Sequence, residues 1–129
     1  MLIETSALVS IMLEEPAAPA LRQAMLKDPT LLISSMSILE AGMVLTSRRG
    51  EAAGKELLNF VEQAGVKVIS FDQEHALVAL EAWLKYGKGH HPAGLNFGDC
   101  CSYAVAKLAR EPLLYIGADF SKMDIARAI

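Results

Sequence analysis

Short apolar runs alternate along this chain with longer segments of helical periodicity, and that alternation constrains the fold more than any other feature. The strand-like runs are Met1–Ile3, Thr30–Ile33, Val66–Ser70 and Leu113–Ile116. Strands that are separated by helices pair in parallel, and the helices cover both faces of the sheet. The sequence therefore predicts an α/β fold with a parallel sheet between two helical layers.

The segments between the strands have helical spacing and recognisable ends. The expected helices are Thr5–Leu13, a second helix opened by Pro19, Ser34–Arg49 closed by Gly50, Ala52–Ala64 followed by Gly65, Asp72–Lys85, Asp99–Ala109 and Ser121–Ile129. In one of them, Leu77, Leu80 and Leu84 recur at helical intervals and form one face of the expected helix. The glycine-rich segment Gly87–Gly98 predicts a loop.

The size and composition of the chain limit its class. Its 129 residues suit a single domain over residues 1–129, and 53% hydrophobic residues suffice for a core. We expect no membrane span and no signal peptide. The adjacent pair Cys100 and Cys101 is a poor disulfide candidate, which favours the reducing cytoplasm. The net charge of −3 argues against bulk electrostatic binding of nucleic acid, although a local basic patch is compatible with it.

Four acidic residues stand in apolar surroundings. Glu4 ends the first strand, Asp119 follows the last one, and Glu40 and Asp99 lie within otherwise apolar helical segments. Because acids are seldom buried without a partner, we expect them to converge at the carboxyl edge of the sheet, where a divalent cation would relieve their repulsion. An oxygen-only ligand set predicts Mg²⁺ or Mn²⁺, and such a site suits phosphodiester hydrolysis.

Each of these acids also has a structural interpretation. The segment Ser37–Glu40 has the spacing of a capping box, and Asp99 could favour a helix dipole. Asp119 could be an ordinary turn acid, and Glu4 an exposed residue at a strand end. The segment Ser121–Asp124 also has capping-box spacing, and for Asp124 the structural interpretation is favoured.

Four segments of the sequence resemble one known family. They are Ile3–Leu8 (IETSAL), Ser37–Glu40 (SILE), Lys88–Cys100 (KGHHPAGLNFGDC) and Pro112–Phe120 (PLLYIGADF). In order and interval they resemble the acidic motifs of PIN domains, specifically the toxin half of VapBC toxin–antitoxin pairs. The resemblance covers essentially the whole chain. It implies a PIN-like three-layer fold, in which helices flank a central parallel sheet of four or five strands.

The resemblance also implies an activity. It indicates a metal-dependent endoribonuclease that hydrolyses RNA phosphodiesters, forms a homodimer and is inhibited by a cognate antitoxin. The catalytic acids would be Glu4, Glu40, Asp99 and Asp119, with Glu4, Asp99 and Asp119 binding the metal. Ser6 would orient a carboxylate or a metal-bound water, although it could also cap the first helix.

Two further groups of residues are candidates for partner contacts. Lys88, His90 and His91 in the glycine-rich loop could bind RNA phosphates, or the loop could simply be solvated. The apolar first helices could form a groove for the antitoxin, or they could pack internally. The residues of that expected groove are Ala7, Leu8, Ile11, Met12, Leu21, Ala24 and Met25.

One residue departs from the family pattern. The first acid is ordinarily Asp, whereas this chain has Glu4. The glutamate carboxylate extends about one methylene further, and Mg²⁺ tolerates little distortion. A displacement of about 1 Å can lower a rate on the order of 100-fold. The alternative interpretation is therefore a catalytically impaired PIN domain that binds RNA or antitoxin without cleaving.

Overall fold

A computed structural model describes residues 1–129 and contains one four-stranded sheet. The strands are β1 (Leu2–Ile3), β2 (Leu32–Ser34), β3 (Lys67–Ile69) and β4 (Leu113–Leu114). Their order is β3-β2-β1-β4, and every pair is parallel. The predicted parallel α/β sheet is therefore confirmed, and β1 is a central strand.

The sheet is apolar on both faces because successive strand residues point in opposite directions. Register aligns Leu2 with Leu32 and Leu113, and it aligns Ile3 with Ile33 and Leu114. The first row packs into one hydrophobic cluster and the second row into another. Burial on both faces explains why the strands read as apolar runs without polar alternation.

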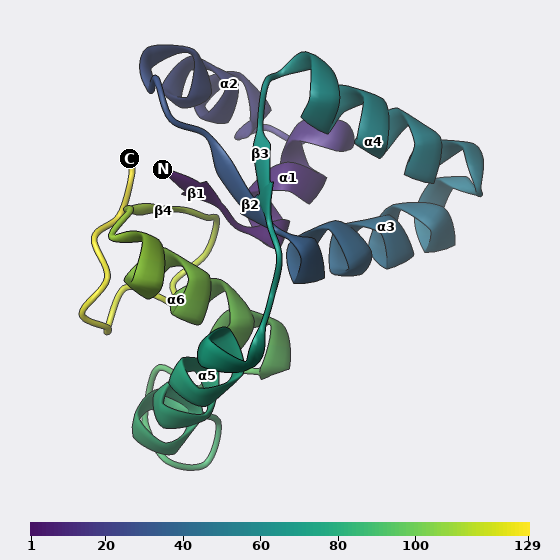
Figure 1. Cartoon of the computed structure of the whole chain (residues 1–129). Coiled ribbons are helices and arrows are strands. Elements are labelled where there is room, and N and C mark those ends of the chain that lie inside the picture. The colour runs from purple at the N-terminus through teal and green to yellow at the C-terminus, as the bar shows by residue number, and fades with distance from the viewer.

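Six helices enclose the sheet in two layers (Figure 1). Their bounds are α1 Thr5–Met12, α2 Ala18–Lys27, α3 Ser35–Arg49, α4 Ala52–Gln63, α5 Gln73–Tyr86 and α6 Phe97–Ala109. Helices α1 to α4 pack on the face that carries Ile3, and α5 and α6 pack on the face that carries Leu2. None of the six combines the length and apolar character that a membrane-spanning helix requires.

The expected helix Ser121–Ile129 does not form, so that prediction is wrong. Residues 117–128 instead make an irregular segment, which we call the C-terminal strap. Its end returns to the sheet, where Leu113 N donates to Ala126 O (2.9 Å) and Ala128 N donates to Leu113 O (3.0 Å). The predicted capping box is also wrong: Ser121 Oγ donates to Ala118 O (2.6 Å), and Asp124 bonds to side chains of α5 and α6.

Helix α5 turns its leucine face away from the core. Leu77, Leu80 and Leu84 are 57%, 54% and 58% exposed. The buried side chains of α5 are His75, Ala79, Ala82 and Tyr86. Small residues at this contact let α5 lie close to α6, and that packing selects the alanine face of the helix. The leucines and the part-exposed Trp83 form an outward apolar surface, which we call the α5 stripe.

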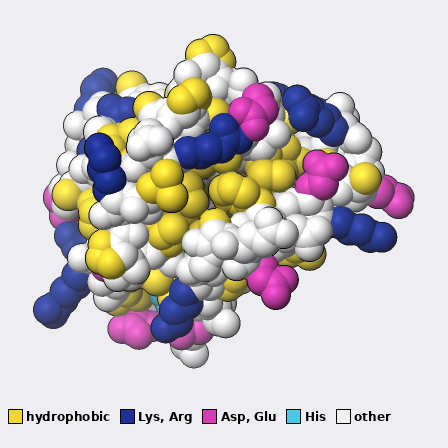
Figure 2. All heavy atoms as spheres, turned by 90° about the horizontal axis from the view of Figure 1, so that it is seen from above, with side chains coloured by type: hydrophobic (Ala, Val, Ile, Leu, Met, Phe, Trp, Pro, Cys, Tyr) yellow, Lys and Arg dark blue, Asp and Glu magenta, His cyan; other side chains and the backbone are white.

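Most side chains of the expected antitoxin groove are buried in the core instead. Ala7, Leu8, Ile11, Leu21, Ala24 and Met25 belong to the hydrophobic cluster beneath the sheet, and Met12 packs against it. Of these, Met25 also lines a cavity of ≈ 400 Å³ between α2 and α4, together with Leu26, Leu31 and Phe60. Seen from above, this end of the molecule carries apolar side chains framed by basic and acidic ones (Figure 2).

Candidate active site

Glu4 joins the central strand to the first helix. It follows β1 directly and is the N-cap of α1, with Oε2 accepting from Ser6 N (2.7 Å) and from Ser6 Oγ. The Ser6 hydroxyl in turn accepts from Ile116 N (2.9 Å), beyond β4. The alternative in which Ser6 caps α1 is wrong, because Glu4 takes that place. Glu4 is also nearly buried, which rules out an exposed strand end.

Asp99 lies in the first turn of α6 within a reciprocal capping box. Asp99 N donates to Asn96 Oδ1 (2.9 Å), and Asn96 N donates to Asp99 Oδ2 (3.0 Å). The first-turn position of Asp99 fits the helix-dipole interpretation, and the sequence did not predict the capping box. The capping box leaves Oδ1 of this buried carboxylate without a hydrogen bond, so capping and ligand binding are compatible.

Glu40 approaches Asp99 from α3. The N-cap of α3 is Ser34, whose Oγ accepts from Met36 N (3.1 Å), so the capping box predicted over Ser37–Glu40 is wrong. The Glu40 carboxylate lies against Gly98: a Cβ added to Gly98 would be 2.3 Å from Glu40 Oε2. The absence of a side chain at Gly98 therefore lets this carboxylate reach the first turn of α6.

A buried contact one turn away holds the same two helices together. Ser37 Oγ and Ser102 Oγ lie 3.4 Å apart, and both residues are almost fully buried. Ser37 precedes Glu40 by three residues, and Ser102 follows Asp99 by three. The two hydroxyls thus fix the crossing of α3 and α6 beside the acids.

Asp119 is the exposed member of the group. It lies in the strap just after Gly117, whose φ of 100° favours glycine, so the interpretation as a turn acid describes its surroundings. Its charge nevertheless raises the pKa of Asp99. Asp119 and Asp99 therefore lie in one electrostatic neighbourhood.

The electrostatics of the site disfavour its charged form. Burial raises the pKa of Glu4 to about 7, the bonds from Ser6 oppose that shift, and the charges of Asp99 and Glu40 add to it. Burial likewise raises the pKa of Asp99 to about 6, with the Asn96 bond opposing the shift and Asp119 and Glu40 adding to it. None of the four acids forms an ion pair. A cation would supply the missing charge.

The donor set fits a hard divalent ion. It consists of carboxylate oxygens, with the Ser6 hydroxyl behind them and neither imidazole nor thiolate among them. No three His, Cys, Asp or Glu side chains are positioned to hold an ion as they stand. Mg²⁺ is usually held by one or two carboxylates and retains several waters, so a closed cage is unnecessary.

The loop before α6 brings basic side chains close to the acids in sequence. His90 and Lys88 are exposed, and the His90 ring meets the edge of Trp83 with centroids 4.5 Å apart. His91 Nδ1 accepts from Ala93 N (3.0 Å), while its ring contacts that of Tyr86. The loop is therefore an ordered surface held by aromatic contacts.

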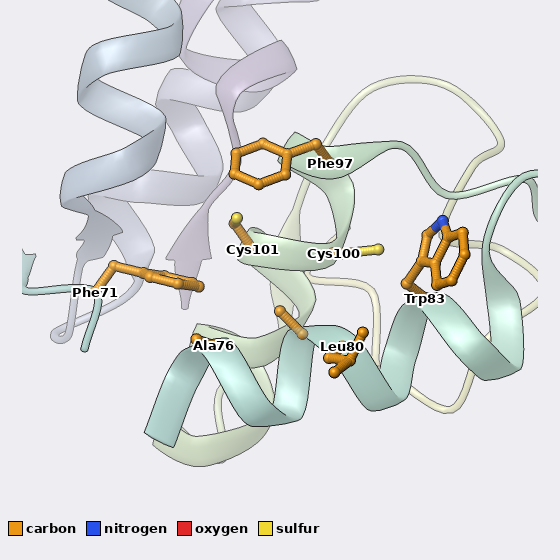
Figure 3. Close-up of a pocket in the computed structure, with 8 residues that line it drawn as sticks. Phe71, Ala76, Leu80, Trp83, Phe97, Cys100 and Cys101 are labelled. Carbon is orange, nitrogen blue, oxygen red and sulfur yellow. The ribbon is translucent and has the colours of Figure 1, made fainter. Parts of the chain in front are cut away.

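An apolar cavity of ≈ 360 Å³ opens between α5 and α6 beside the acid cluster. Figure 3 shows the rings of Phe71, Trp83 and Phe97 around it, with Cys100 and Cys101 contributed by α6. Phe97 is 73% exposed although it begins the helix that carries Asp99. The sequence predicted neither this exposed ring nor the close contact at Gly98, because both depend on how α3, α5 and α6 pack together.

Comparison with known proteins identifies the family. The sequence model of the PIN domain matches residues 1–126. A ribonuclease VapC of Mycolicibacterium smegmatis is 45% identical over 126 residues, covering 98% of both chains. Ribonuclease VapC30 of Mycobacterium tuberculosis is 43% identical over 126 residues, covering 98% of this chain and 96% of that protein.

Solved structures have the same fold. Mycobacterium tuberculosis VapC20, described as a sarcin-ricin loop cleaving toxin, superposes with a TM-score of 0.80 over 97% of this chain and 95% of its own, at 19% identity. A toxin–antitoxin complex from Klebsiella pneumoniae gives a TM-score of 0.71 over 95% of this chain and 92% of its own, also at 19% identity.

The chain therefore belongs to the PIN-domain family, and its curated relatives group it with the VapC ribonuclease toxins. Enzymes of this group are ribonucleases that depend on a divalent metal, so the predicted class, a metal-dependent endoribonuclease toxin, is confirmed. The alternative of an impaired binding module is not favoured.

Replacing Gly98 tests whether the position of Glu40 matters. In Gly98→Ala, the new Cβ displaces the Glu40 carboxylate, and we expect RNA cleavage to fall by about 100-fold. Stability should hold, because alanine favours a helix over glycine by roughly 0.5–1 kcal/mol. Gly54→Ala is the matched control, since its nearest neighbour, Thr46 Oγ1, lies 3.8 Å away. Equal activity in both variants would contradict the assigned packing.

The raised pKa of Glu4 predicts a pH dependence of stability without metal. Folding raises this pKa from 4.5 to about 7, so the folded state holds a proton that the unfolded state releases. The resulting contribution to the free energy of unfolding is complete below about pH 4.5 and is lost as the pH rises through about 7. Urea unfolding in EDTA should show this fall, and Glu4→Gln should reduce it to the part that the raised pKa of Asp99 contributes. Parallel profiles for the two proteins would argue against the shift.

Proposed function

We propose that the four acids form the catalytic site for hydrolysis of RNA phosphodiesters, with Mg²⁺ or Mn²⁺ as the ion. The observation that carries this assignment is that Glu4, Glu40 and Asp99 converge from separate elements and that no basic side chain pairs with them. Glu4 and Asp99 would hold the ion through Oε1 and Oδ1, which are free of hydrogen bonds, and the exposed Asp119 would complete its protein ligands.

The protein side chains have distinct roles in this proposal. When bound, the ion activates a water and stabilises the attacking and leaving oxygens. Ser6 fixes the Glu4 carboxylate through Oε2, and Asn96 fixes Asp99 through Oδ2. Glu40, held against Gly98, accepts a proton from the attacking water.

Lys88, His90 and His91 supply the contacts to the RNA backbone. The loop that carries them leads directly into Asn96 and α6, so an RNA strand whose phosphate binds to the loop can extend toward Asp99. A chain with a net charge of −3 needs such a local basic surface to hold a polyanion. Acting on RNA, and with both cysteines free, the protein would work in the cytoplasm.

The antitoxin would bind at the cavity between α2 and α4. Leu26, 79% exposed, lines this cavity with Met25 and Phe60, and Arg22 and Asp28 also line it. An amphipathic segment of the antitoxin can bury its apolar residues there. Arg22 and Asp28 are already paired within the chain, with Glu14 and with the Met1 amino group, so apolar contact carries this proposal. The apolar surface framed by charges in Figure 2 fits such a partner.

The homodimer would form through the α5 stripe and Phe97. This surface carries the exposed ring of Phe97 at the rim of the apolar cavity between α5 and α6. In a symmetric pair, the ring of each copy can insert into the cavity of the other. A twofold interface requires such self-complementarity.

Cleavage assays with matched variants test the nuclease. The antitoxin-free protein should cut a pool of structured cellular RNAs at discrete positions with Mg²⁺ or Mn²⁺ and not with EDTA. Asp99→Asn should abolish cutting, whereas Glu4→Asp should retain it. Cleavage by Glu4→Asp alone would instead support a scaffold silenced at position 4, and persistent cleavage by Asp99→Asn would refute the site.

Two charge insertions separate the proposed interfaces. Leu80→Glu should convert the dimer to a monomer in light-scattering measurements and leave antitoxin binding intact. Leu26→Glu should leave the dimer intact and weaken antitoxin binding by at least about tenfold, the scale of roughly 1.4 kcal/mol. The opposite pattern would reverse the two assignments, and no effect from either variant would refute both.

A further inference from the structure

Asp124 is the most heavily bonded acid in the chain, and nothing in the reaction requires it. Its Oδ1 accepts from Tyr103 Oη (2.8 Å) and from Tyr86 Oη (3.2 Å), and its Oδ2 accepts from Lys107 Nζ (2.6 Å). The Lys107 bond leads in lowering the pKa of Asp124 to about 2. The carboxylate therefore stays charged, and this anchor holds, at any pH at which the enzyme works.

The anchor and the acidic site use one face of α6. Asp99, Tyr103 and Lys107 are four residues apart, so their side chains line the same side of the helix. At one end of that face, Asp99 senses the charge of Asp119. At the other end, Tyr103 and Lys107 hold Asp124. The C-terminal strap thus bonds to α6 at the anchor, and it carries Asp119 within electrostatic range of Asp99.

Between the anchor and Asp119 the strap is held by two apolar side chains, Phe120 and Met123, and by single backbone turns. It has no regular secondary structure over residues 117–125, and its local backbone bonds are single turns such as Ser121 N to Ala118 O (3.1 Å). Phe120 is buried against Tyr115, with ring centroids 5.0 Å apart. The apolar contact of Phe120 keeps the strap against the core but allows it to shift along α6. The three directed hydrogen bonds to the Asp124 carboxylate fix the position of the strap along that helix.

We propose that Asp124 sets the register of the strap along α6 and so positions Asp119 opposite Asp99. Asp124 is a positioning residue in this account, since it acts through Asp119 and touches neither ion nor RNA. The inference rests on the proposed role of Asp119 as a metal ligand.

Metal binding by the full-length chain tests this without relying on activity. Mn²⁺ affinity would be measured by electron paramagnetic resonance for the wild type, Asp124→Ala, Asp119→Asn and the double variant. We expect each single change to weaken Mn²⁺ binding by about tenfold, the usual scale for residues that support a metal ligand. The double variant should be no weaker than Asp119→Asn, because both changes remove the same ligand.

A conservative variant separates position from simple stability. Asp124→Asn retains an oxygen for the two tyrosine hydroxyls and loses the ion pair, so its Mn²⁺ affinity should stay within about twofold of wild type. If Asp124→Ala does not fold, the double change Tyr86→Phe and Tyr103→Phe removes the same hydroxyl donors and should weaken Mn²⁺ binding similarly.

Three results would overturn the inference. The first is an unchanged Mn²⁺ affinity in Asp124→Ala, or in the tyrosine double variant when that stands in for it. The second is a loss of Mn²⁺ affinity in Asp124→Ala that adds in full to the loss in Asp119→Asn. The third is a wild-type chain that binds no Mn²⁺. Only the last would also overturn the proposed metal site, so failure of the register and failure of the site are distinguishable.

Discussion

Carboxylates with no cationic partner are held together at one edge of the sheet, and much of the surrounding structure compensates for their repulsion. Parallel strands bring Glu4 and the segment before Asp119 to the same edge, because β1 and β4 are neighbours and end together. Hydrogen bonds from Ser6 and Asn96 favour the charged forms, yet burial still raises the pKa of Glu4 and of Asp99. The site is destabilised in the way that a functional site often is, and a cation would relieve it.

The glutamate at position 4 fits this arrangement through its second role. Its side chain turns back to cap α1, and one carboxylate oxygen is fixed by the backbone and hydroxyl of Ser6. Because the glutamate side chain turns back on α1, its extra methylene relative to aspartate does not simply extend the carboxylate outward. The position of the carboxylate is set by its hydrogen bonds at the helix end and not by side-chain length alone. This gives a physical reason why the residue change is compatible with the ribonuclease class that the relatives indicate.

Local sequence patterns predicted what depends on local physics. Apolar runs and helical spacing gave the parallel sheet and all helices but the last, because burial on two faces leaves a direct signature in the strands. The leucines of α5 do share one face, but this helix has two apolar sides and periodicity does not say which one meets α6. Asp124 was misassigned because its partners lie 38, 21 and 17 residues away, beyond the reach of a capping pattern.

The central claim for this site is that the acids share one metal ion. The most direct measurement is a crystal structure of the chain soaked in Mn²⁺, with anomalous scattering to locate the ion. We predict Mn²⁺ bound by the carboxylates of Glu4 and Asp99, with Asp119 turned toward it and Ser6 still bonded to Glu4. Well-ordered acids with no anomalous peak among them at saturating Mn²⁺, or an ion bound elsewhere, would contradict the account.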